Sequence, residues 1–378
     1  MSTAPPSQRR RIWDAPVRVF HWSLAACFGA LWLTREAQRM DLHAAAGYAM
    51  AALIVFRLLW GFVGGWPARF AAFAHSPAAA LRYLRQSMTG RAPEFLSHNP
   101  AGSWSVYLLL GSATLGVVSG VLLIAAEHGL GPLAPSVSVL AAPTIHSLHE
   151  IVAWAMVALF CAHIAGVVVG SLAHRQNLLL SMVSGHKDHV PADLPPVRSR
   201  ALVAFVLAMG LAGGLYTYLD RSGWTESYAT ARAQAKQDAA AAVPGAWGEE
   251  CGSCHLAYPA QLLPARSWQR MLREQDAHFG ESLGLKDERL AELEALALEP
   301  APARWAGATL QASVAPAESP QRITETGFWR ERHRRLQDAE FKSDQVSGKH
   351  DCAACHADAF AGAFSPRLIR IPTIQAPP

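Results

Sequence analysis

The sequence has 378 residues, of which 51% are hydrophobic and 16% are charged, and its net charge at pH 7 is only +4. This hydrophobic content is high for a soluble protein, and the small net charge argues against nucleic acid as a partner. Because the apolar residues are concentrated in about the first 220 positions, we expect a membrane region followed by a polar region.

Five apolar runs follow a basic N-terminal segment, MSTAPPSQRRRIWDAPVRVFHW, that shows no cleavage site of a removable signal peptide. Each run is close to the length of about 20 residues that a membrane-spanning helix needs. The runs cover residues 19–34, 42–63, 106–126, 144–172 and 201–219. Five spans would place the two ends of the chain on opposite sides of the membrane.

The basic residues predict the orientation of these spans. Most of those in the membrane region precede the first span or lie in the second-to-third and fourth-to-fifth connections: Arg9, Arg10, Arg11, Arg69, Arg82, Arg85, Arg91, Arg175, Lys187, Arg198 and Arg200. The opposite connections carry only Arg35 and Arg39. The positive-inside rule therefore places the N-terminus in the cytoplasm and the region after Leu219 outside it.

The fourth run carries two histidines, His149 and His163, which are fourteen residues apart. On a helix this spacing puts both on one face, about 21 Å apart along the axis. Intramembrane histidines usually serve a cofactor or partner, so two on one face favour two stacked metal or haem sites. The alternative is that each imidazole only bonds to a neighbouring helix. His146 is rotated off this face by about 100° and is interpreted as an interfacial or loop histidine.

Two further histidines match these by depth. His21 begins the first span on the cytoplasmic side, the side of His163. His43 begins the second span on the outer side, the side of His149. We therefore predict the pairs His21 with His163 and His43 with His149.

The polar region contains two identical spacings of cysteine and histidine, Cys251-Gly-Ser-Cys254-His255 and Cys352-Ala-Ala-Cys355-His356. This spacing is typical of covalent c-type haem, in which two thiols bond to the vinyl groups and the histidine binds the iron. The alternatives are disulfides or one zinc site, but the histidine that follows each pair is needed only for haem. Cys27 and Cys161 lie within apolar spans and are interpreted as small hydrophobic residues.

Three other histidines of the polar region could supply the sixth iron ligands. His278 and His333 are predicted on helical segments that can fold back over the first and second haem, respectively. His350 lies two residues before Cys352, too close to reach the far face of the ring, and is interpreted as a surface residue.

The predicted fold class is all-α. We expect a four-helix membrane domain at residues 1–190, a fifth membrane helix and linker at 191–246, and a mainly α, loop-rich exported domain at 247–378. An Ala- and Pro-rich segment at 299–321 is expected to divide the exported domain into two halves.

The membrane region resembles the bacterial cytochrome b561 and nickel-iron hydrogenase b-subunit superfamily. The resemblance covers residues 11–184 and rests on WDAPVRVFHW, HAAAGY followed by RLLWGFVG, and LHE followed by AHIAGV. It implies a four-helix bundle in the bacterial inner membrane with two b-type haems, whose ligands carry over as His21 with His163 and His43 with His149.

The exported region resembles the small dihaem cytochrome c family over residues 247–371. The motifs are CGSCHLAYPAQLLPARSW, DAHFGE, RITETGFW and CAACHADAFAGAF. The resemblance implies two covalent haems with bis-histidine ligation, His255 with His278 and His356 with His333.

Two arginines are candidate partners of haem propionates. Arg18 lies just before His21, and Arg57 lies late in the second span. Guanidinium binds carboxylate in two-point geometry, and an arginine at that depth needs a partner. The alternative is that both are interfacial positive-inside residues.

The haems would carry the chemistry, since no nucleophile, phosphate loop or acid pair accompanies these histidines. The first hypothesis is electron transfer between membrane quinone and a soluble periplasmic redox protein, which leaves open a quinol:cytochrome c-type oxidoreductase activity. The second is a haem-b anchor and docking subunit of a dehydrogenase or hydrogenase complex. The third, a haem sensor, would need an open coordination site, whereas each iron here has two candidate histidines.

Overall fold

The computed structural model describes residues 7–35, 40–128, 130–133, 136–137, 141–191, 195–198, 200–222, 230, 232–235, 245–298, 310–311, 313–334, 336–362, 364–365 and 368–372. These residues are mainly helical and contain one two-stranded sheet, which confirms the all-α fold class. Residues 223–229, 231 and 236–244 of the predicted linker and 299–309 and 312 of the predicted Ala- and Pro-rich segment lie outside them.

The chain divides into two compact units. The first contains Met1–Leu33, Leu42–Gly120 and Ser147–Arg221. The second contains Thr34–Asp41, Val121–His146 and Ser222–Pro378. The segments Thr34–Asp41 and Val121–His146 therefore group with the C-terminal residues and not with the membrane helices that they adjoin in the sequence.

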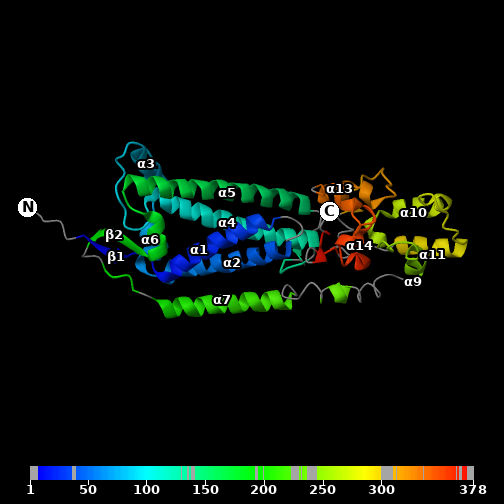
Figure 1. Cartoon of the computed structure of the whole chain (residues 1–378), viewed down its shortest axis with the longest axis horizontal. Helices are drawn as coiled ribbons and strands as arrows, with labels where there is room; N and C mark the ends of the chain where they lie inside the picture. The colour runs from blue at the N-terminus through cyan, green and yellow to red at the C-terminus, as the bar shows by residue number, and fades with distance from the viewer. Residues whose placement is uncertain are drawn as a thin grey trace, which may run out of the picture. The chain divides into compact units, whose positions relative to one another are not determined.

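Five long helices form most of the first unit (Figure 1). They are α1 (Ala15–Leu33), α2 (Met40–Val63), α4 (Pro100–His128), α5 (Ala142–Ala173) and α7 (Ala201–Arg221). Each overlaps one predicted apolar run. Four of them, α2, α4, α5 and α7, are long and apolar enough to cross a membrane. The shorter α1 does not meet this criterion, and Arg18 and His21 interrupt its apolar stretch near the start.

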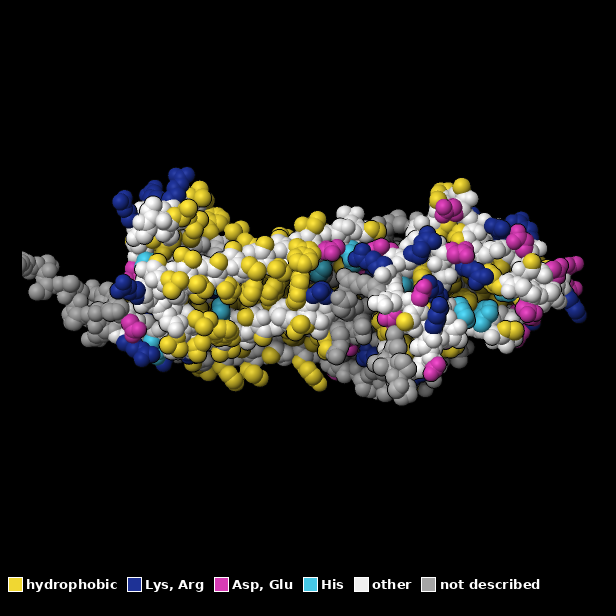
Figure 2. Space-filling model, turned by 45° about the horizontal axis from the view of Figure 1, so that its top comes forward, with side chains coloured by type: hydrophobic (Ala, Val, Ile, Leu, Met, Phe, Trp, Pro, Cys, Tyr) yellow, Lys and Arg dark blue, Asp and Glu magenta, His cyan; other side chains and the backbone are white. Residues whose placement is uncertain are grey.

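Large apolar side chains cover the outside of these helices (Figure 2). Ile151 and Trp154 on α5 are 65% and 58% exposed, and Phe205 on α7 is 62% exposed. Soluble monomers rarely expose apolar patches this extensive, whereas lipid contact requires them. The first unit is therefore that of an integral membrane protein.

Asp14 fixes the beginning of α1. Its Oδ1 accepts a hydrogen bond from the backbone N of Val17 at 2.9 Å, as an N-cap residue does. Its Oδ2 accepts one from the indole Nε1 of Trp60 on α2 at 3.2 Å. Asp14 and Trp60 are buried. This contact orients the helix that carries His21.

A short antiparallel ribbon joins two distant parts of the first unit. Strand β1 (Ser7–Arg11) pairs with β2 (His186–Pro191), which follows α6 (Leu178–Ser184). Gly185 links α6 to β2 with φ of 84°, and an added Cβ would lie 2.7 Å from the carbonyl O of Trp13. Only glycine fits this left-handed turn without displacing the backbone beside α1.

The second unit contains short helices connected by long loops. They are α9 (Gly245–Cys251), α10 (Ala265–Arg273), α11 (Asp287–Ala297), α13 (Gly327–Arg332) and α14 (Cys352–Cys355). Trp247, Leu263, Trp268 and Leu293 form the buried core of its first half. This agrees with the predicted mainly α, loop-rich architecture.

Candidate functional site

Histidines from three helices form two close pairs in the first unit. The ring centroid of His21 on α1 lies 6.4 Å from that of His163 on α5. The ring centroid of His43 on α2 lies 6.3 Å from that of His149, also on α5. The structure thus brings together both pairs that were predicted by depth, with α5 contributing one ring to each.

Three of these four rings have a hydrogen-bond partner for Nδ1. The Nδ1 of His43 lies 3.0 Å from the carbonyl O of Leu31, and that of His149 lies 2.9 Å from Oγ of Ser119. The Nδ1 of His163 lies 3.3 Å from Oγ of Ser105. A proton on Nδ1 leaves the lone pair on Nε2, which is how metal-binding histidines are commonly oriented.

The two serines were missed in the sequence, although a signal for them exists. Ser105 and Ser119 on α4 are fourteen residues apart, the same spacing as His149 and His163 on α5. Since Ser119 contacts His149 and Ser105 contacts His163, the two helices run antiparallel with matched spacings. Ser119 also donates to the carbonyl O of Gly116 at 3.1 Å, so its oxygen accepts from His149.

The second unit contains two further histidine pairs with the same separation. The ring centroids of His255 and His278 are 6.2 Å apart, with 23° between the ring planes. Those of His333 and His356 are 6.1 Å apart, with 68° between the planes. His350 is exposed, in line with its interpretation as a surface residue.

The first of these pairs is held by irregular backbone. Cys251 is the last residue of α9, and Cys254 and His255 lie in the turn that follows. His278 was predicted on a helical segment, but α10 ends at Arg273 and is followed by a short 3-10 helix, Gln275–Ala277, so His278 lies beyond both. Phe279, next to His278, has φ of 52°, which is incompatible with a continuing helix.

The second pair combines a helix end with a short bridge. His333 is the C-cap residue of α13, and its ring stacks on Trp329 at 4.3 Å while its Nδ1 lies 2.9 Å from the carbonyl O of Trp329. Cys352 and Cys355 begin and end the single turn of α14, and the N of His356 donates to the carbonyl O of Cys352 at 2.8 Å. His356 also forms an antiparallel bridge with Ile369.

Comparison with protein families identifies both parts of the chain. Residues 12–185 match the family model of prokaryotic cytochrome b561. Residues 247–364 match that of dihaem cytochrome c. The chain thus joins a segment that matches one family to a segment that matches the other. These matches confirm the two resemblances found in the sequence.

Individual relatives agree with the b561 assignment. Two proteins described as probable Ni/Fe-hydrogenase B-type cytochrome subunits, from Rhodobacter capsulatus and Azotobacter vinelandii, are each 26% identical. The alignments cover 48% and 46% of this chain and 84% and 86% of those proteins. A solved dihaem cytochrome c from Rhodobacter sphaeroides is 32% identical over 31% of this chain and 93% of its own, with a TM-score of 0.28.

The four histidine pairs fit iron bound between two imidazoles. An Fe–N bond is about 2.0 Å and the imidazole centre lies about 1.1 Å behind its nitrogen, so two such ligands place their centroids about 6.2 Å apart. The four observed separations lie between 6.1 and 6.4 Å. Beside His43, one helical turn on, a Cβ added to Gly47 would meet no heavy atom within 4 Å. The donor sets and spacing therefore suit haem b in the b561 domain and haem c in the dihaem domain.

The alternative zinc site would need its ligands to converge on one point. Among the described residues, no group of three or more His, Cys, Asp or Glu side chains is placed to hold a single metal ion. The two Cys-x-x-Cys-His segments are therefore not gathered into such a cluster.

The two candidate propionate partners have different surroundings in the b561 domain. Arg57 is 4% exposed, its guanidinium lies 4.7 Å from the ring centroid of Phe70, and its buried Nη1 has no hydrogen-bond partner. Arg18 donates through Nη1 to the carbonyl O of Val183, while its buried Nε has no partner. Each thus has one donor unsatisfied by the protein, as a binding site for a carboxylate requires.

His98, in the connection before α4, is partly buried, and its buried Nδ1 has no hydrogen-bond partner. Its ring centroid lies 4.4 Å from that of Phe73 and 4.9 Å from that of Trp13. Burial and, to a smaller extent, the nearby charge of Arg57 lower the pKa of His98 to about 3. His98 is therefore neutral at physiological pH and packs against Trp13 and Phe73.

Burial also shifts the pKa values of His356 and Cys352 in the dihaem domain. It lowers the pKa of His356 to about 4, with repulsion from His333 adding to the effect. It raises the pKa of the Cys352 thiol to about 11. His356 is consequently neutral at physiological pH, with the lone pair that iron binding requires.

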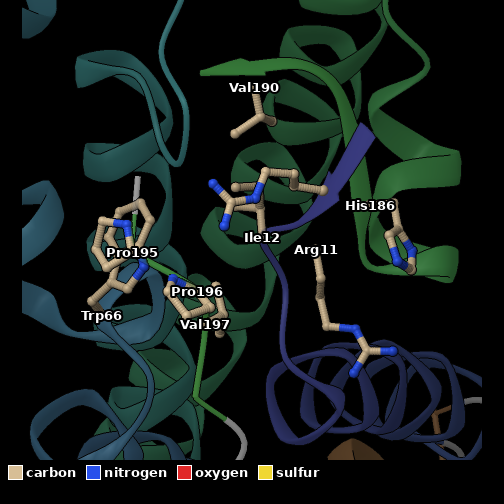
Figure 3. A pocket seen from close by; sticks show the side chains of 9 residues that line it. Arg11, Ile12, Trp66, His186, Val190, Pro195, Pro196 and Val197 are labelled. Carbon is tan, nitrogen blue, oxygen red and sulfur yellow. The ribbon is translucent and has the colours of Figure 1, made fainter. Parts of the chain in front are cut away.

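A separate pocket of about 350 Å³ lies in the b561 domain beside the β ribbon (Figure 3). Its lining residues are Arg10, Arg11, Ile12, Trp66, His186, Val190, Pro195, Pro196 and Val197. The indole Nε1 of Trp66 is buried without a hydrogen-bond partner. The lining therefore suits a polar or anionic group better than an apolar one.

Haem and electron transfer are common to the two families. The chain is consequently an integral-membrane b-type cytochrome, related to hydrogenase b-type subunits, that carries a dihaem c domain for electron transfer.

Proposed function

We propose that this protein carries electrons between the quinone pool of the bacterial inner membrane and a soluble periplasmic redox protein, using two b-type and two c-type haems. The observation that carries the proposal is the set of four histidine pairs with ring centroids 6.1 to 6.4 Å apart. When bound, haem supplies reversible one-electron chemistry at its iron.

The ligands of the proposed haems are assigned by pair. His21 with His163 and His43 with His149 hold the two b haems. Cys251, Cys254, His255 and His278 hold the first c haem, and Cys352, Cys355, His356 and His333 hold the second. Two imidazoles for each iron leave no open position, which suits electron transfer better than binding of a small ligand.

Arg57 and Arg18 are proposed to bind haem propionates in the b561 domain. The support is their unsatisfied buried donors, Nη1 and Nε respectively. An arginine buried at this depth is costly unless a carboxylate or a carbonyl compensates its charge.

The proposed orientation has the N-terminus in the cytoplasm and the dihaem domain in the periplasm. Its support is the excess of arginine and lysine at one set of connections, together with the covalent c-type motifs in the C-terminal region. The pair His43 and His149 would then lie on the periplasmic side, and the pair His21 and His163 on the cytoplasmic side.

A second candidate function is a haem-b anchor and docking subunit of a larger dehydrogenase or hydrogenase complex. The supporting observation is that several relatives are described as Ni/Fe-hydrogenase B-type cytochrome subunits. In that case electrons would arrive from a partner subunit rather than from quinol.

The test is reduction of the full-length protein in native membranes by a quinol analogue, followed at the separate b and c absorption bands. Electron transfer from quinol through the four proposed haems, the conduit hypothesis, predicts rapid reduction of the b band followed by the c band. A His163→Ala variant should lose reduction from the cytoplasmic side, whereas the matched His146→Ala variant should retain it. Bands that both remain oxidised would contradict the conduit and favour the anchor.

A further inference from the structure

An acidic residue at the C-terminal end of α4 binds an arginine of the dihaem domain within the second unit. Glu127 accepts from Arg332 through both carboxylate oxygens, at 2.8 Å from Nη1 to Oε2 and 2.5 Å from Nη2 to Oε1. The Glu127 side chain is only 8% exposed. A two-point pair that is partly buried is among the stronger polar contacts and fixes direction as well as distance.

A second acidic residue, at the N-terminal end of α2, makes a looser contact of the same kind. Asp41 Oδ2 lies 3.6 Å from Nη2 of Arg370. The backbone N of Arg370 donates to the carbonyl O of Cys355 at 2.8 Å, and the preceding residue, Ile369, bridges to His356. Arg370 is therefore tied directly to the second Cys-x-x-Cys-His segment.

Both arginines adjoin ligands of the second c haem, and the two acids lie at the ends of α2 and α4 on the side of His43 and of Ser119, the partner of His149. Arg332 precedes His333 in the chain, and Asp41 lies two residues before His43. Glu127 also lies 3.5 Å from Nδ1 of His146, which is three residues before His149 on α5. Asp41 and Glu127 thus mark the helix ends next to the pair His43 and His149.

The half of the dihaem domain that holds the first c haem has a different arrangement of charges. Its Arg289 lies 2.8 Å from Glu249, 2.9 Å from Glu250 and 2.8 Å from Glu292, all in the same half. These ion pairs hold α9 and α11 together and involve no residue of the membrane helices.

We infer that Asp41 and Glu127 form an acidic docking site for Arg332 and Arg370, and that this site positions the second c haem as the one that exchanges electrons with the b561 domain. The first c haem, held by His255 and His278, is then the one that faces the soluble partner. The inference rests on the proposed function and adds the order of the four haems.

The test uses the full-length protein with Arg332→Gln, Arg370→Gln and the double variant, and Arg289→Gln as the matched control in the other half. Amide hydrogen exchange of residues 327–333 should become faster in the docking variants and remain unchanged in the control. After mixing with a quinol analogue, the b band should be reduced at the native rate while reduction of the c band slows about tenfold, equivalent to about 1.4 kcal/mol of docking free energy. The charge swap Glu127→Arg with Arg332→Glu should restore part of that rate.

A second set of variants distinguishes the two c haems. Without the first haem, in Cys251→Ala with Cys254→Ala, the remaining c haem should be reduced at close to the native rate. Without the second haem, in Cys352→Ala with Cys355→Ala, reduction of the first should slow by at least about tenfold. Equal rates in these two proteins, or unchanged exchange and c-band kinetics in the docking variants, would overturn the inference alone. A b band that quinol fails to reduce in the unmodified protein would overturn the proposed function and this inference with it.

Discussion

The b561 domain and the dihaem domain bring their histidines together in different ways. In the b561 domain the rings lie on long helices, and Leu31, Ser105 and Ser119 provide partners for Nδ1. In the dihaem domain His278 and His356 lie in isolated bridges and His333 at a helix end. The regular rise of a helix can fix the positions of histidines that bind a noncovalent cofactor. Loops can position the histidines where two thioether bonds would also hold the haem. The following predictions test that contrast.

The largest expected difference is one of topology. A reporter enzyme that is active only outside the cytoplasm, fused after Leu219, should give full activity, and the same fusion at Gly90 should give none, because the basic connections remain inside. Whole-cell reporter assays measure this directly. Activity at Gly90 would invert the orientation and remove the dihaem domain from the compartment proposed for it.

The second prediction concerns covalent attachment. Acid-acetone extraction of the unmodified protein should leave half of its haem on the polypeptide, measured as pyridine haemochrome. In Cys352→Ala with Cys355→Ala, one covalent haem should be lost. The matched control is Cys27→Ala with Cys161→Ala, which changes the cysteines of α1 and α5 and should leave the covalent fraction intact. A covalent fraction near zero in the unmodified protein would exclude c-type haem.

The third prediction separates the two b haems. His163→Ala should remove the haem that His21 would share, and His149→Ala the haem that His43 would share, because each substitution takes away one of the two proposed histidine ligands. Extractable haem per chain should fall by half in either variant. His146→Ala is the control, since its imidazole contacts Glu127 and no histidine ring. A loss in this control as large as that in His149→Ala would invalidate the pairing.

The smallest expected effect is on haem potential. Ser119→Ala removes the acceptor for Nδ1 of His149, so the imidazole becomes a poorer electron donor and the b haem is easier to reduce. A lost hydrogen bond worth about 1 kcal/mol corresponds to a rise of about 40 mV for a one-electron couple. Redox titration of the b band measures this shift.

Two other serines of α4 calibrate that measurement. Ser105→Ala should produce a smaller rise, since its oxygen lies 3.3 Å from His163 rather than 2.9 Å. Ser112→Ala should produce none, because its hydroxyl donates to the backbone carbonyl of Leu109. A fall in potential in Ser119→Ala, or equal shifts in all three variants, would contradict the assigned role of the contact.

The sequence predicted the long helices well because membrane spans have a strong and local signal. The run at 144–172 became α5 (Ala142–Ala173), and the run at 42–63 became α2 (Met40–Val63). The histidine pairs could be predicted from the sequence because helical spacing and the Cys-x-x-Cys-His motif are local patterns.

Other features were not predicted, because they depend on contacts between distant segments. The arginines of β1 looked only like a positive flank, yet Arg11 pairs with His186 across the ribbon. The amphipathic helix α3 (Pro77–Met88) was not predicted, because the arginines of this connection were used only to predict the orientation of the spans. Nothing local in the sequence reveals that Trp13 and Phe73 pack against His98.

The matched spacings of Ser105 with Ser119 and of His149 with His163 lock the register of α4 and α5. Sliding one helix along the other by a single turn, about 5.4 Å, would break both serine–histidine contacts together, which favours the observed register. The two helices therefore hold the two proposed b-haem positions about 21 Å apart along the axis. Insertion of one residue between His149 and His163 would rotate the second ring by about 100° and disrupt that haem position while leaving the other intact.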